Sequence, residues 1–328
     1  MSKRKLNKRQ QARIQKQQAS HHTSSTSETS SESLSGLSGT IIANHGKTVI
    51  VENTERKTFT CHLRQNLETL VCGDKVTWSQ ESDNTGIVLA LHPRTNFLAR
   101  PDKRGKAKVI AANIDQTLIV SAAKPVLNTR LIDRYLLSAE IAAITPIIVF
   151  NKIDLPDEQS MRNFKEQLAI YQSLDYHVVF TCAKHAIDIS HLKPVLVNKV
   201  SVFVGQSGVG KSSLINAIHP EAVAAVGDIS SSTNKGRHTT TLAQLYHLPE
   251  GGDLIDSPGI REFGLWKIEI EQAASGFKEF QPFLGTCRFR DCLHEDEPGC
   301  NIRAAVENGE INPLRWDSYR RILESLRE

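Results

Sequence analysis

The chain has 328 residues, of which 39% are hydrophobic, 23% charged and 6% aromatic, as is typical of a globular protein with two or three domains. No apolar run approaches the about 18 residues of a membrane-spanning helix, and the charged N-terminus lacks the apolar core of a secretory signal. We therefore expect a cytoplasmic protein with no membrane partner, whose six cysteines serve as metal ligands or free thiols rather than in disulfides.

The net charge of +4 is unevenly distributed, because residues 1–20 hold seven basic side chains and no acidic one. Residues 20–38 are rich in serine and threonine and have little to bury. This composition predicts a disordered arm over residues 1–37. The basic part could bind nucleic-acid phosphates without sequence preference, although a solvated terminus with no partner or a transit peptide would share its composition.

Five short runs of alternating or β-branched residues follow the arm, and turns rich in glycine, asparagine and aspartate separate them. They are Thr40–Ala43, Thr48–Glu52, Lys57–Leu63, Lys75–Ser79 and Thr85–Leu91. Such a succession is typical of a small barrel. Residues 38–92 are therefore predicted to form an OB-type β-barrel, a fold that often binds nucleic acid, although a barrel that serves only packing fits the pattern as well.

Residues 93–108 are rich in proline, arginine and lysine and are predicted to be a linker. Over residues 109–275, apolar strands alternate with helical stretches, which predicts an α/β domain whose parallel sheet is covered on both faces. The expected strands are Gln116–Ser121, Thr145–Phe150, His177–Thr181 and Val200–Val204, and the expected helices are Arg130–Ala142 and Gln159–Ser173. Residues 276–328 are predicted to be a C-terminal α-helical domain that ends in a helix capped by Asn312.

A phosphate-binding loop is predicted after the strand Val200–Val204. Residues 205–212 have the sequence GQSGVGKS and run into a helix, which is the context that a P-loop requires. Its glycines let backbone N–H groups face phosphate oxygens at a helix N-terminus. Lys211 would reach the β- and γ-phosphates, and the Ser212 hydroxyl would coordinate Mg²⁺. The predicted nucleotide contacts here are Gly205, Gln206, Ser207, Gly208, Val209, Gly210, Lys211, Ser212 and Ser213.

Two further segments complete the predicted triphosphate site. Asp253–Gly259 is a short apolar strand that ends in Asp-x-x-Gly, in which Asp256 would hold Mg²⁺ through water and the Gly259 N–H would meet the γ-phosphate. The polar segment Lys235–Thr241 lies where a switch loop would order around the triphosphate and relax after hydrolysis. One of its threonines would complete the Mg²⁺ shell, and Thr240 is counted with Lys211 among the candidate catalytic residues.

Residues 151–154, which have the sequence NKID and directly follow an apolar run, predict guanine specificity. Asp154 would accept hydrogen bonds from N1–H and the exocyclic amine of guanine, which adenine does not offer in that arrangement. Asn151 would support the guanine edge, and the stem of Lys152 would pack along the ring. Residues 181–184 (TCAK), after the next strand, resemble the loop that backs the base, and Thr181, Cys182 and Ala183 are counted among the nucleotide contacts.

The base motif precedes the phosphate motif in this chain, whereas ordinary GTPases have the opposite order. The same sheet can form if the chain is cut and rejoined elsewhere, which compact domains with adjacent termini tolerate. The predicted fold is therefore a circularly permuted P-loop GTPase domain of the α/β class. Two alternatives stay open: an RNA-binding module that uses nucleotide only structurally, and a P-loop ATPase or kinase, against which Asp154 argues.

Four soft metal ligands lie within fourteen residues near the C-terminus: Cys287, Cys292, His294 and Cys300. Three thiolates and one imidazole suit tetrahedral Zn²⁺ in a closed structural site, so one zinc ion is predicted. Residues 288–290 (RFR) interleave charge with an aromatic ring, which fits contact with RNA and fits solvent-facing loop residues as well. Cys61, Cys72 and Cys182 lie apart from the cluster and are predicted to be buried or inert.

Together these motifs resemble the ribosome small-subunit-dependent GTPase A family, circularly permuted bacterial GTPases with an OB domain and a C-terminal zinc domain. The resemblance covers residues 38–328 and rests on the inverted order of the nucleotide motifs, the string Gly236–Thr241, the segment Asp256–Gly259 and the cysteine–histidine cluster. It implies contact with the small (30S) ribosomal subunit and its 16S rRNA, assistance in late subunit maturation, and GTP hydrolysis that the subunit stimulates. We further expect a monomer that binds GTP and GDP.

The resemblance also bears on hydrolysis. Ile260 follows the Asp-x-x-Gly segment, where Ras-like enzymes place a glutamine that orients water, and an isoleucine cannot do this. In the family, a histidine corresponding to His238 is a candidate substitute. His238 is therefore predicted to be catalytic, although contact with RNA or stabilisation of the loop would also account for it.

Overall fold

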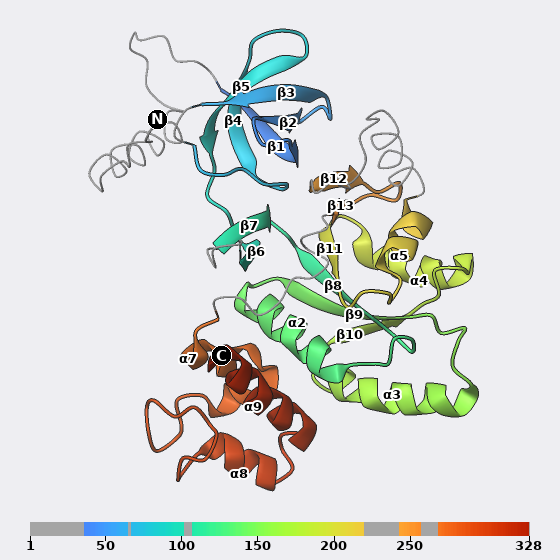
Figure 1. Ribbon diagram of the computed structural model, residues 1–328, viewed down its shortest axis with the longest axis vertical. Helices are drawn as coiled ribbons and strands as arrows, with labels where there is room; N and C mark the ends of the chain where they lie inside the picture. The colour runs from blue at the N-terminus through green and yellow to red at the C-terminus, as the bar shows by residue number, and fades with distance from the viewer. Residues whose placement is uncertain (1–35, 65–66, 102–106, 220–242, 257–267, 328) are drawn as a thin grey trace. The chain divides into compact units, whose positions relative to one another are not determined.

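The computed structural model describes residues 36–64, 67–101, 107–219, 243–256 and 268–327 (Figure 1). The chain divides into two compact units, Met1–Arg94 and Thr95–Glu328, and each is taken by itself below. Within the described ranges, no helix is both long enough and apolar enough to cross a membrane.

The first unit contains a closed five-stranded barrel. Its strands are β1 (Leu37–Asn44), β2 (Thr48–Asn53), β3 (Thr58–Leu63), β4 (Lys75–Gln80) and β5 (Thr85–Leu91). They follow the order β1-β2-β3-β5-β4, β4 pairs back onto β1, and β3 and β5 run parallel. A closed barrel of this kind removes the exposed strand edges. The predicted OB-type barrel is confirmed, and β1 begins at Leu37, one residue inside the predicted arm.

The barrel core follows from the alternation of apolar residues along each strand. Phe59 and Cys61 of β3 are buried while their neighbours are exposed, as the two-residue period of a strand requires. The Trp78 ring of β4 packs on Phe59 with ring centroids 4.5 Å apart. Burial raises the pKa of the Cys61 thiol to about 11, and Cys72 is also fully buried. Both observations agree with the prediction that these two thiols are buried or inert.

The second unit opens with a two-stranded antiparallel sheet of its own, formed by β6 (Phe97–Pro101) and β7 (Ala107–Ala112). This differs from the predicted linker over residues 93–108, which contains all of β6 and the start of β7. The strand signal is weak in the sequence because only three apolar residues precede Arg100 and Pro101.

Six strands of the second unit form the main sheet of its described part. They are β8 (Gln116–Ala122), β9 (Thr145–Asn151), β10 (His177–Phe180), β11 (Val200–Val204), β12 (Gln244–His247) and β13 (Asp253–Asp256). Their order is β10-β9-β8-β11-β13-β12, and each neighbouring pair is parallel except β12–β13. Every residue of β8 is buried, as expected for a parallel strand that is covered on both faces.

Among the described residues, four helices cover this sheet: α2 (Thr129–Ile141), α3 (Glu158–Gln172), α4 (Ala186–Leu196) and α5 (Lys211–Ile218). In β9, Ile147 and Val149 belong to the core shared with α4 and α5. Phe150 faces the opposite side, where its ring lies 5.2 Å from that of Phe164 in α3. Consequently α2 and α3 lie on one face and α4 and α5 on the other (Figure 1).

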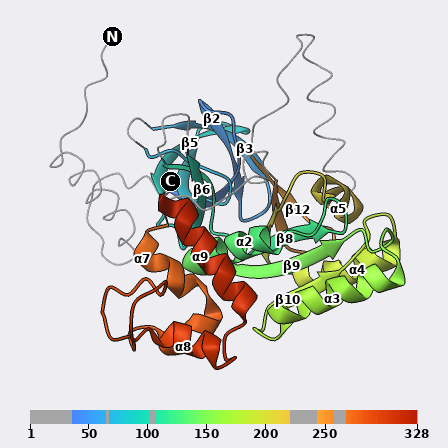
Figure 2. The same cartoon turned by 60° about the horizontal axis from the view of Figure 1, so that its bottom comes forward.

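The C-terminal part of the second unit is a helical module. It contains α7 (Ile270–Ala273), the 3-10 helices η1 (Ala274–Gly276) and η2 (Lys278–Phe283), α8 (Asn301–Glu307) and α9 (Pro313–Arg327). The rings of Phe277, Phe280 and Tyr319 form its centre, with centroids 5.0–5.4 Å apart. Its core includes Ala273 and Ala274, so the module starts before the predicted boundary at residue 276. Helix α9 lies against α2 (Figure 2).

Candidate nucleotide and metal sites

The predicted phosphate loop joins β11 to α5, and its backbone requires glycine at three positions. Gly205, Gly208 and Gly210 have φ values of +137°, +82° and +99°, which residues with a side chain rarely adopt. A Cβ atom at Gly205 would lie 2.2 Å from the carbonyl oxygen of Val120, and one at Gly210 would lie 2.3 Å from Nδ2 of Asn151. The loop is therefore pressed against β8 and β9 with no space for a side chain at these two points.

The predicted phosphate-binding lysine lies over this loop. The Lys211 side chain is almost fully buried, and its Nζ donates to the carbonyl oxygens of Gly205 (2.6 Å) and Gln206 (2.7 Å). Ser212 follows in the first turn of α5, where backbone N–H groups have no partner within the helix. The structure thus gathers an ammonium group, a hydroxyl group and a helix N-terminus at one place, a combination suited to a phosphate chain.

Asn151 connects the predicted base loop to the phosphate loop. It is the last residue of β9 and is 1% exposed. Its Nδ2 donates to the carbonyl oxygen of Val209 at 2.9 Å, and its Oδ1 accepts from the backbone N–H of Ala183 at 3.2 Å. Lys152 adds a second connection, since its Nζ donates to the Gly208 carbonyl at 2.5 Å. Three segments that are far apart in the sequence therefore meet at this asparagine.

Asp154 is held by the loop that follows β10. Its carboxylate accepts hydrogen bonds from the Cys182 thiol at 3.2 Å and from Nζ of Lys184 at 3.1 Å. These two donors hold the pKa of Asp154 below its usual value, so the group is an ionised acceptor at neutral pH. Cys182 is buried, as predicted, but it is not inert, and Lys184 is a partner of Asp154 that the sequence analysis placed only in the backing loop.

Parallel strands place the remaining predicted residues at the same edge of the sheet. Thr181 directly follows β10 and Asp256 ends β13, beside β11. The carboxyl ends of such strands are where α/β proteins bind their ligands. His238, Thr240 and Gly259, together with the rest of the string Gly236–Thr241, lie outside the described residues.

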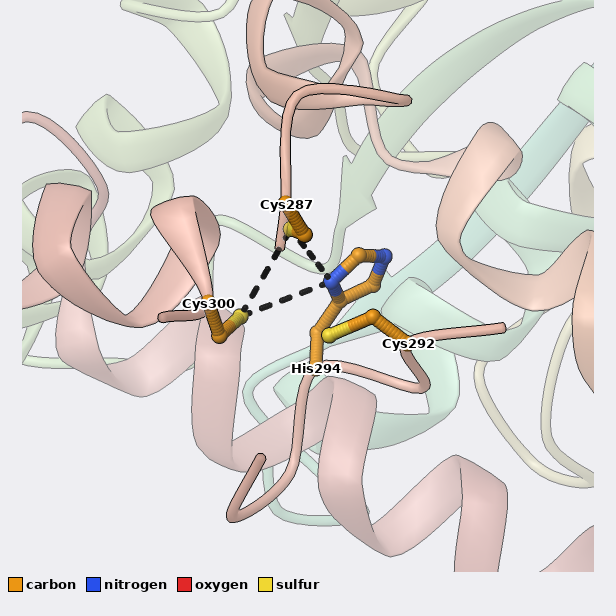
Figure 3. A group of neighbouring side chains, drawn as sticks. All are labelled: Cys287, Cys292, His294 and Cys300. Atoms are coloured by element: carbon orange, nitrogen blue, oxygen red, sulfur yellow. Dashed lines mark hydrogen bonds between the residues drawn. The ribbon is translucent and has the colours of Figure 1, made fainter. Parts of the chain in front are cut away.

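The four predicted zinc ligands converge in the C-terminal module (Figure 3). Nδ1 of His294 lies 3.5 Å from the sulfur atoms of both Cys287 and Cys300, and these two sulfurs are 4.0 Å apart. With Cys292, all four ligand atoms lie within 4.8 Å of one another. A tetrahedral zinc ion with Zn–S bonds of about 2.3 Å and Zn–N bonds of about 2.0 Å would separate its ligands by about 3.5–3.8 Å. The residues present therefore fit a metal ion of this size.

The surroundings of the cluster also favour a metal. Backbone N–H groups of Asn301 and Arg303, in the first turn of α8, donate to the sulfurs of Cys287 (3.4 Å) and Cys300 (3.5 Å). Burial raises the pKa of Cys292 to about 12 and also raises that of Cys300. Thiolates at these positions therefore require a nearby cation, which a divalent metal ion supplies.

The fold and the nucleotide motifs together define the class of protein. A P-loop and an NKID loop meet at one edge of a parallel sheet although the NKID loop comes first in the chain, and this is the arrangement of a circularly permuted GTPase. The model of the RsgA GTPase family matches residues 91–266. The chain belongs to this family.

Proteins of known name and structure are similar over nearly the whole chain. A protein of Haemophilus influenzae named small ribosomal subunit biogenesis GTPase RsgA is 47% identical and covers 100% of this chain and 97% of its own length. A protein of the same name from Actinobacillus pleuropneumoniae is 46% identical, with coverages of 99% and 96%. Among solved structures, YjeQ from Thermotoga maritima is 36% identical, with a TM-score of 0.74 and coverages of 88% and 98%. YloQ, described as a circularly permuted GTPase, is 31% identical, with a TM-score of 0.72 and coverages of 89% and 95%.

The contacts of Asp154 lead to a prediction about base specificity. Replacing Asp154 by asparagine is expected to lower GTP affinity about 10- to 100-fold and to leave affinity for ATP unchanged, because hydrogen bonds to a charged acceptor contribute about 1.5–3 kcal/mol. Titration of the purified variant with GTP and ATP measures both affinities. Asp175→Asn is the matched control, since Asp175 is exposed in the turn before β10, away from the motif. Unaltered GTP affinity in Asp154→Asn would refute the base-site assignment.

Proposed function

We propose that this protein is a GTPase that binds the small (30S) ribosomal subunit and its 16S rRNA and assists a late step of subunit maturation. The observation that carries the proposal is the junction at Asn151, which ties a guanine-type base loop to a phosphate loop in permuted order. The names of the Haemophilus influenzae and Actinobacillus pleuropneumoniae relatives supply the biological setting. Ribosome assembly places the protein in the cytoplasm, where it acts as a monomer that exchanges GTP and GDP.

In this proposal, GTP lies between residues 205–213 and residues 151–154, with residues 181–183 behind the base. Ser212 and Asp256 would hold the Mg²⁺ that accompanies the triphosphate, and this ion would offset the negative charge of the phosphates. Lys211 stabilises the negative charge that develops during transfer of the γ-phosphoryl group. His238 would orient the attacking water, Thr240 would complete the metal shell, and Gly259 would contact the γ-phosphate.

The flanking domains supply the contacts to the subunit. The barrel belongs to a fold that binds oligonucleotides, and the C-terminal module holds its loop around one structural zinc ion bound by Cys287, Cys292, His294 and Cys300. The triphosphate orders the segment Gly236–Thr241, the flanking domains then bind rRNA, and hydrolysis weakens that binding. The subunit stimulates hydrolysis in this proposal because rRNA holds His238 in the orientation that positions the attacking water.

The test is GTP turnover with and without purified small ribosomal subunits, with large subunits and ATP as controls. Strong stimulation by small subunits alone supports the proposal. Tight GTP binding without stimulation would instead favour an RNA-binding module that uses the nucleotide only as a structural switch.

The stimulated reaction also tests the proposed role of His238. His238→Ala is expected to lower the stimulated rate about 100-fold with little change in GTP affinity, since a positioned group that handles the proton or the water contributes about 10²- to 10⁴-fold. His177→Ala, at the exposed start of β10, is the control and should retain full stimulation. A stimulated rate in His238→Ala equal to that of the control would remove His238 from the mechanism.

A further inference from the structure

A second group of potential metal ligands lies beside the predicted base site, apart from the C-terminal cluster. Cys182, His185 and Asp188 each offer one ligand atom, and these atoms lie within 4.8 Å of one another. Nδ1 of His185 is 3.3 Å from Oδ2 of Asp188. The Cys182 thiol belongs to a buried residue, whereas the Asp188 side chain is 15% exposed and the His185 side chain is 56% exposed. Solvent therefore reaches the group from the histidine side.

The backbone brings these three side chains together. His185 is the N-cap residue of α4, and Asp188 lies in the first turn of that helix, so the two side chains share one face. The His185 N–H donates to the carbonyl oxygen of Cys182 at 3.1 Å, which folds the preceding loop onto the start of the helix. The Thr181 hydroxyl donates to the carbonyl oxygen of Asp188 at 3.1 Å. The arrangement is thus set by a hydrogen-bonded turn and not only by the side chains themselves.

Helix capping does not account for the histidine and the carboxylate. In a capping box, the N-cap side chain accepts from an N–H of the first turn, and the side chain three residues later accepts from the N-cap N–H. The His185 side chain makes no capping bond, and its N–H is bonded to Cys182 instead. The imidazole and the Asp188 carboxylate lie against each other beside the thiol, where both remain available as ligands.

The three ligand types select the class of metal ion. A thiolate, an imidazole and a carboxylate are ligands of zinc and similar transition metals, whereas Mg²⁺ and Ca²⁺ prefer oxygen ligands. Ligand atoms around tetrahedral zinc lie about 3.3–3.8 Å apart, and rotation of the exposed His185 ring can supply the closure that this requires. Three protein ligands leave the fourth position open, unlike the four-ligand cluster near the C-terminus. Binding at this group is therefore expected to be reversible.

We propose that Cys182, His185 and Asp188 bind a second zinc ion, which opposes the binding of GTP. Coordination replaces the thiol proton of Cys182 by the metal, and the proton passes to solvent. Asp154 then loses the hydrogen bond that it accepts from this thiol at 3.2 Å, and its carboxylate is close enough to the sulfur to enter the open metal position. The same carboxylate is the predicted acceptor for guanine. The inference goes beyond the proposed function and depends on GTP binding alone, not on the ribosomal part.

The test is a titration of the full-length protein with Zn²⁺ in a metal buffer, with GTP affinity measured at each free zinc concentration and Mg²⁺ in excess. The wild type is expected to bind two zinc ions, the first tightly at the C-terminal cluster and the second reversibly. Occupation of the second site should lower GTP affinity about 10-fold, and by no more than the about 100-fold limit of Asp154→Asn, because the metal acts through that carboxylate. GTP should weaken the second zinc by the same factor, since equilibrium coupling is reciprocal.

His185→Ala removes an exposed ligand and leaves the predicted nucleotide contacts in place. It should weaken the second zinc at least about 10-fold, since even the loss of a group that only supports a metal ligand weakens binding about 10- to 100-fold. GTP affinity should then be insensitive to zinc and equal to that of the zinc-free wild type. Cys182→Ser keeps a hydroxyl donor for Asp154 and should also lose the second zinc.

The matched control is His191→Ala, which removes another exposed histidine of α4 and should behave as the wild type does. Chelation of zinc by the nucleotide itself would affect both histidine variants equally. A single zinc ion bound by the wild type, or equal affinity for the second zinc in His185→Ala and His191→Ala, would overturn the inference. It would also be overturned by GTP affinity that does not change when the second zinc binds. None of these outcomes depends on ribosomal subunits, so failure here is distinguishable from failure of the proposed function.

Discussion

Cys300→Ser is expected to lower the zinc content of the purified protein from one per chain to well below one and to unfold the loop around residues 287–300. Cys300 has two roles, since it is a candidate ligand and also caps α8 by accepting from the N–H of Arg303. The free energy of binding a structural zinc ion contributes directly to the stability of the fold, and it amounts to about 10–16 kcal/mol in zinc-finger peptides. The loss here should be smaller but above about 4 kcal/mol, because the aromatic core of the module remains.

The effect should spread beyond the loop, because the loop is bonded to α9. The Trp316 Nε1–H donates to the carbonyl oxygen of His294 at 3.3 Å, and the Tyr319 hydroxyl donates to that of Leu293 at 2.8 Å. Elemental analysis, together with hydrogen exchange along α9, measures both consequences. A strong chelator should reproduce them in the wild type. The control is Cys72→Ser, whose thiol donates to the carbonyl oxygen of Ile42 in the barrel. Full zinc occupancy in Cys300→Ser, or equal loss in the control, would contradict the assignment.

The barrel and the sheet could be predicted closely because their signals are local. Strand β11 has the predicted bounds, and β5 does as well, since continuous apolar or alternating runs end at clear turn residues. The nucleotide motifs could be located for a related reason. A P-loop needs glycine where a Cβ atom would collide with the next strand, as at Gly205, so the constraint is visible in the sequence itself.

The elements that the sequence did not reveal depend on tertiary packing. Helix α4 is absent from the predicted elements because Pro194 lies inside it, and Ile189, Leu192 and Leu196 become a recognisable stripe only once the core is known. The two hydrogen-bond partners of Asp154 could not be predicted from the sequence either. Nothing in a four-residue TCAK string shows that its thiol and its lysine both reach a carboxylate about thirty positions earlier.

Arg315 is a buried basic residue of α9 that the sequence analysis does not identify. Basic residues are almost never fully buried unless they are paired, yet the Arg315 side chain is 2% exposed. It lies between Asp133 of α2 and Glu279 of η2, donating to Asp133 through Nη1 and to Glu279 through Nε at 2.6 Å. Its guanidinium also lies 4.6 Å from the ring centre of Phe277. Although burial alone would lower it, the two carboxylates raise the pKa of Arg315, so the group remains charged.

Arg315→Met is therefore expected to destabilise the C-terminal module by about 3–5 kcal/mol, because it leaves two buried carboxylates without their cation. Adding Asp133→Asn and Glu279→Gln should restore most of the loss, since the uncompensated charges are then gone. Arg321→Met is the matched control on the same helix. Its ion pair with Asp317 is half exposed and should contribute less than about 1 kcal/mol. Denaturant unfolding followed by Trp316 fluorescence separates these cases, and equal losses in Arg315→Met and Arg321→Met would show that the buried pair has no special role.

The same substitution should reach the nucleotide site through α2. Leu131 and Ile132 of this helix line a small pocket together with Gln206 and Val209 of the phosphate loop, and Asp133 is the next residue. Within three consecutive positions, α2 therefore lines a pocket shared with the phosphate loop and bonds to Arg315 of the C-terminal module. If GTP binding stabilises the C-terminal module through this helix, then the folded module must in turn strengthen GTP binding. GTP should protect the amides of α9 from exchange in the wild type, and Arg315→Met should abolish that protection and weaken GTP binding. Protection of α9 by GTP that survives in Arg315→Met would place the coupling elsewhere.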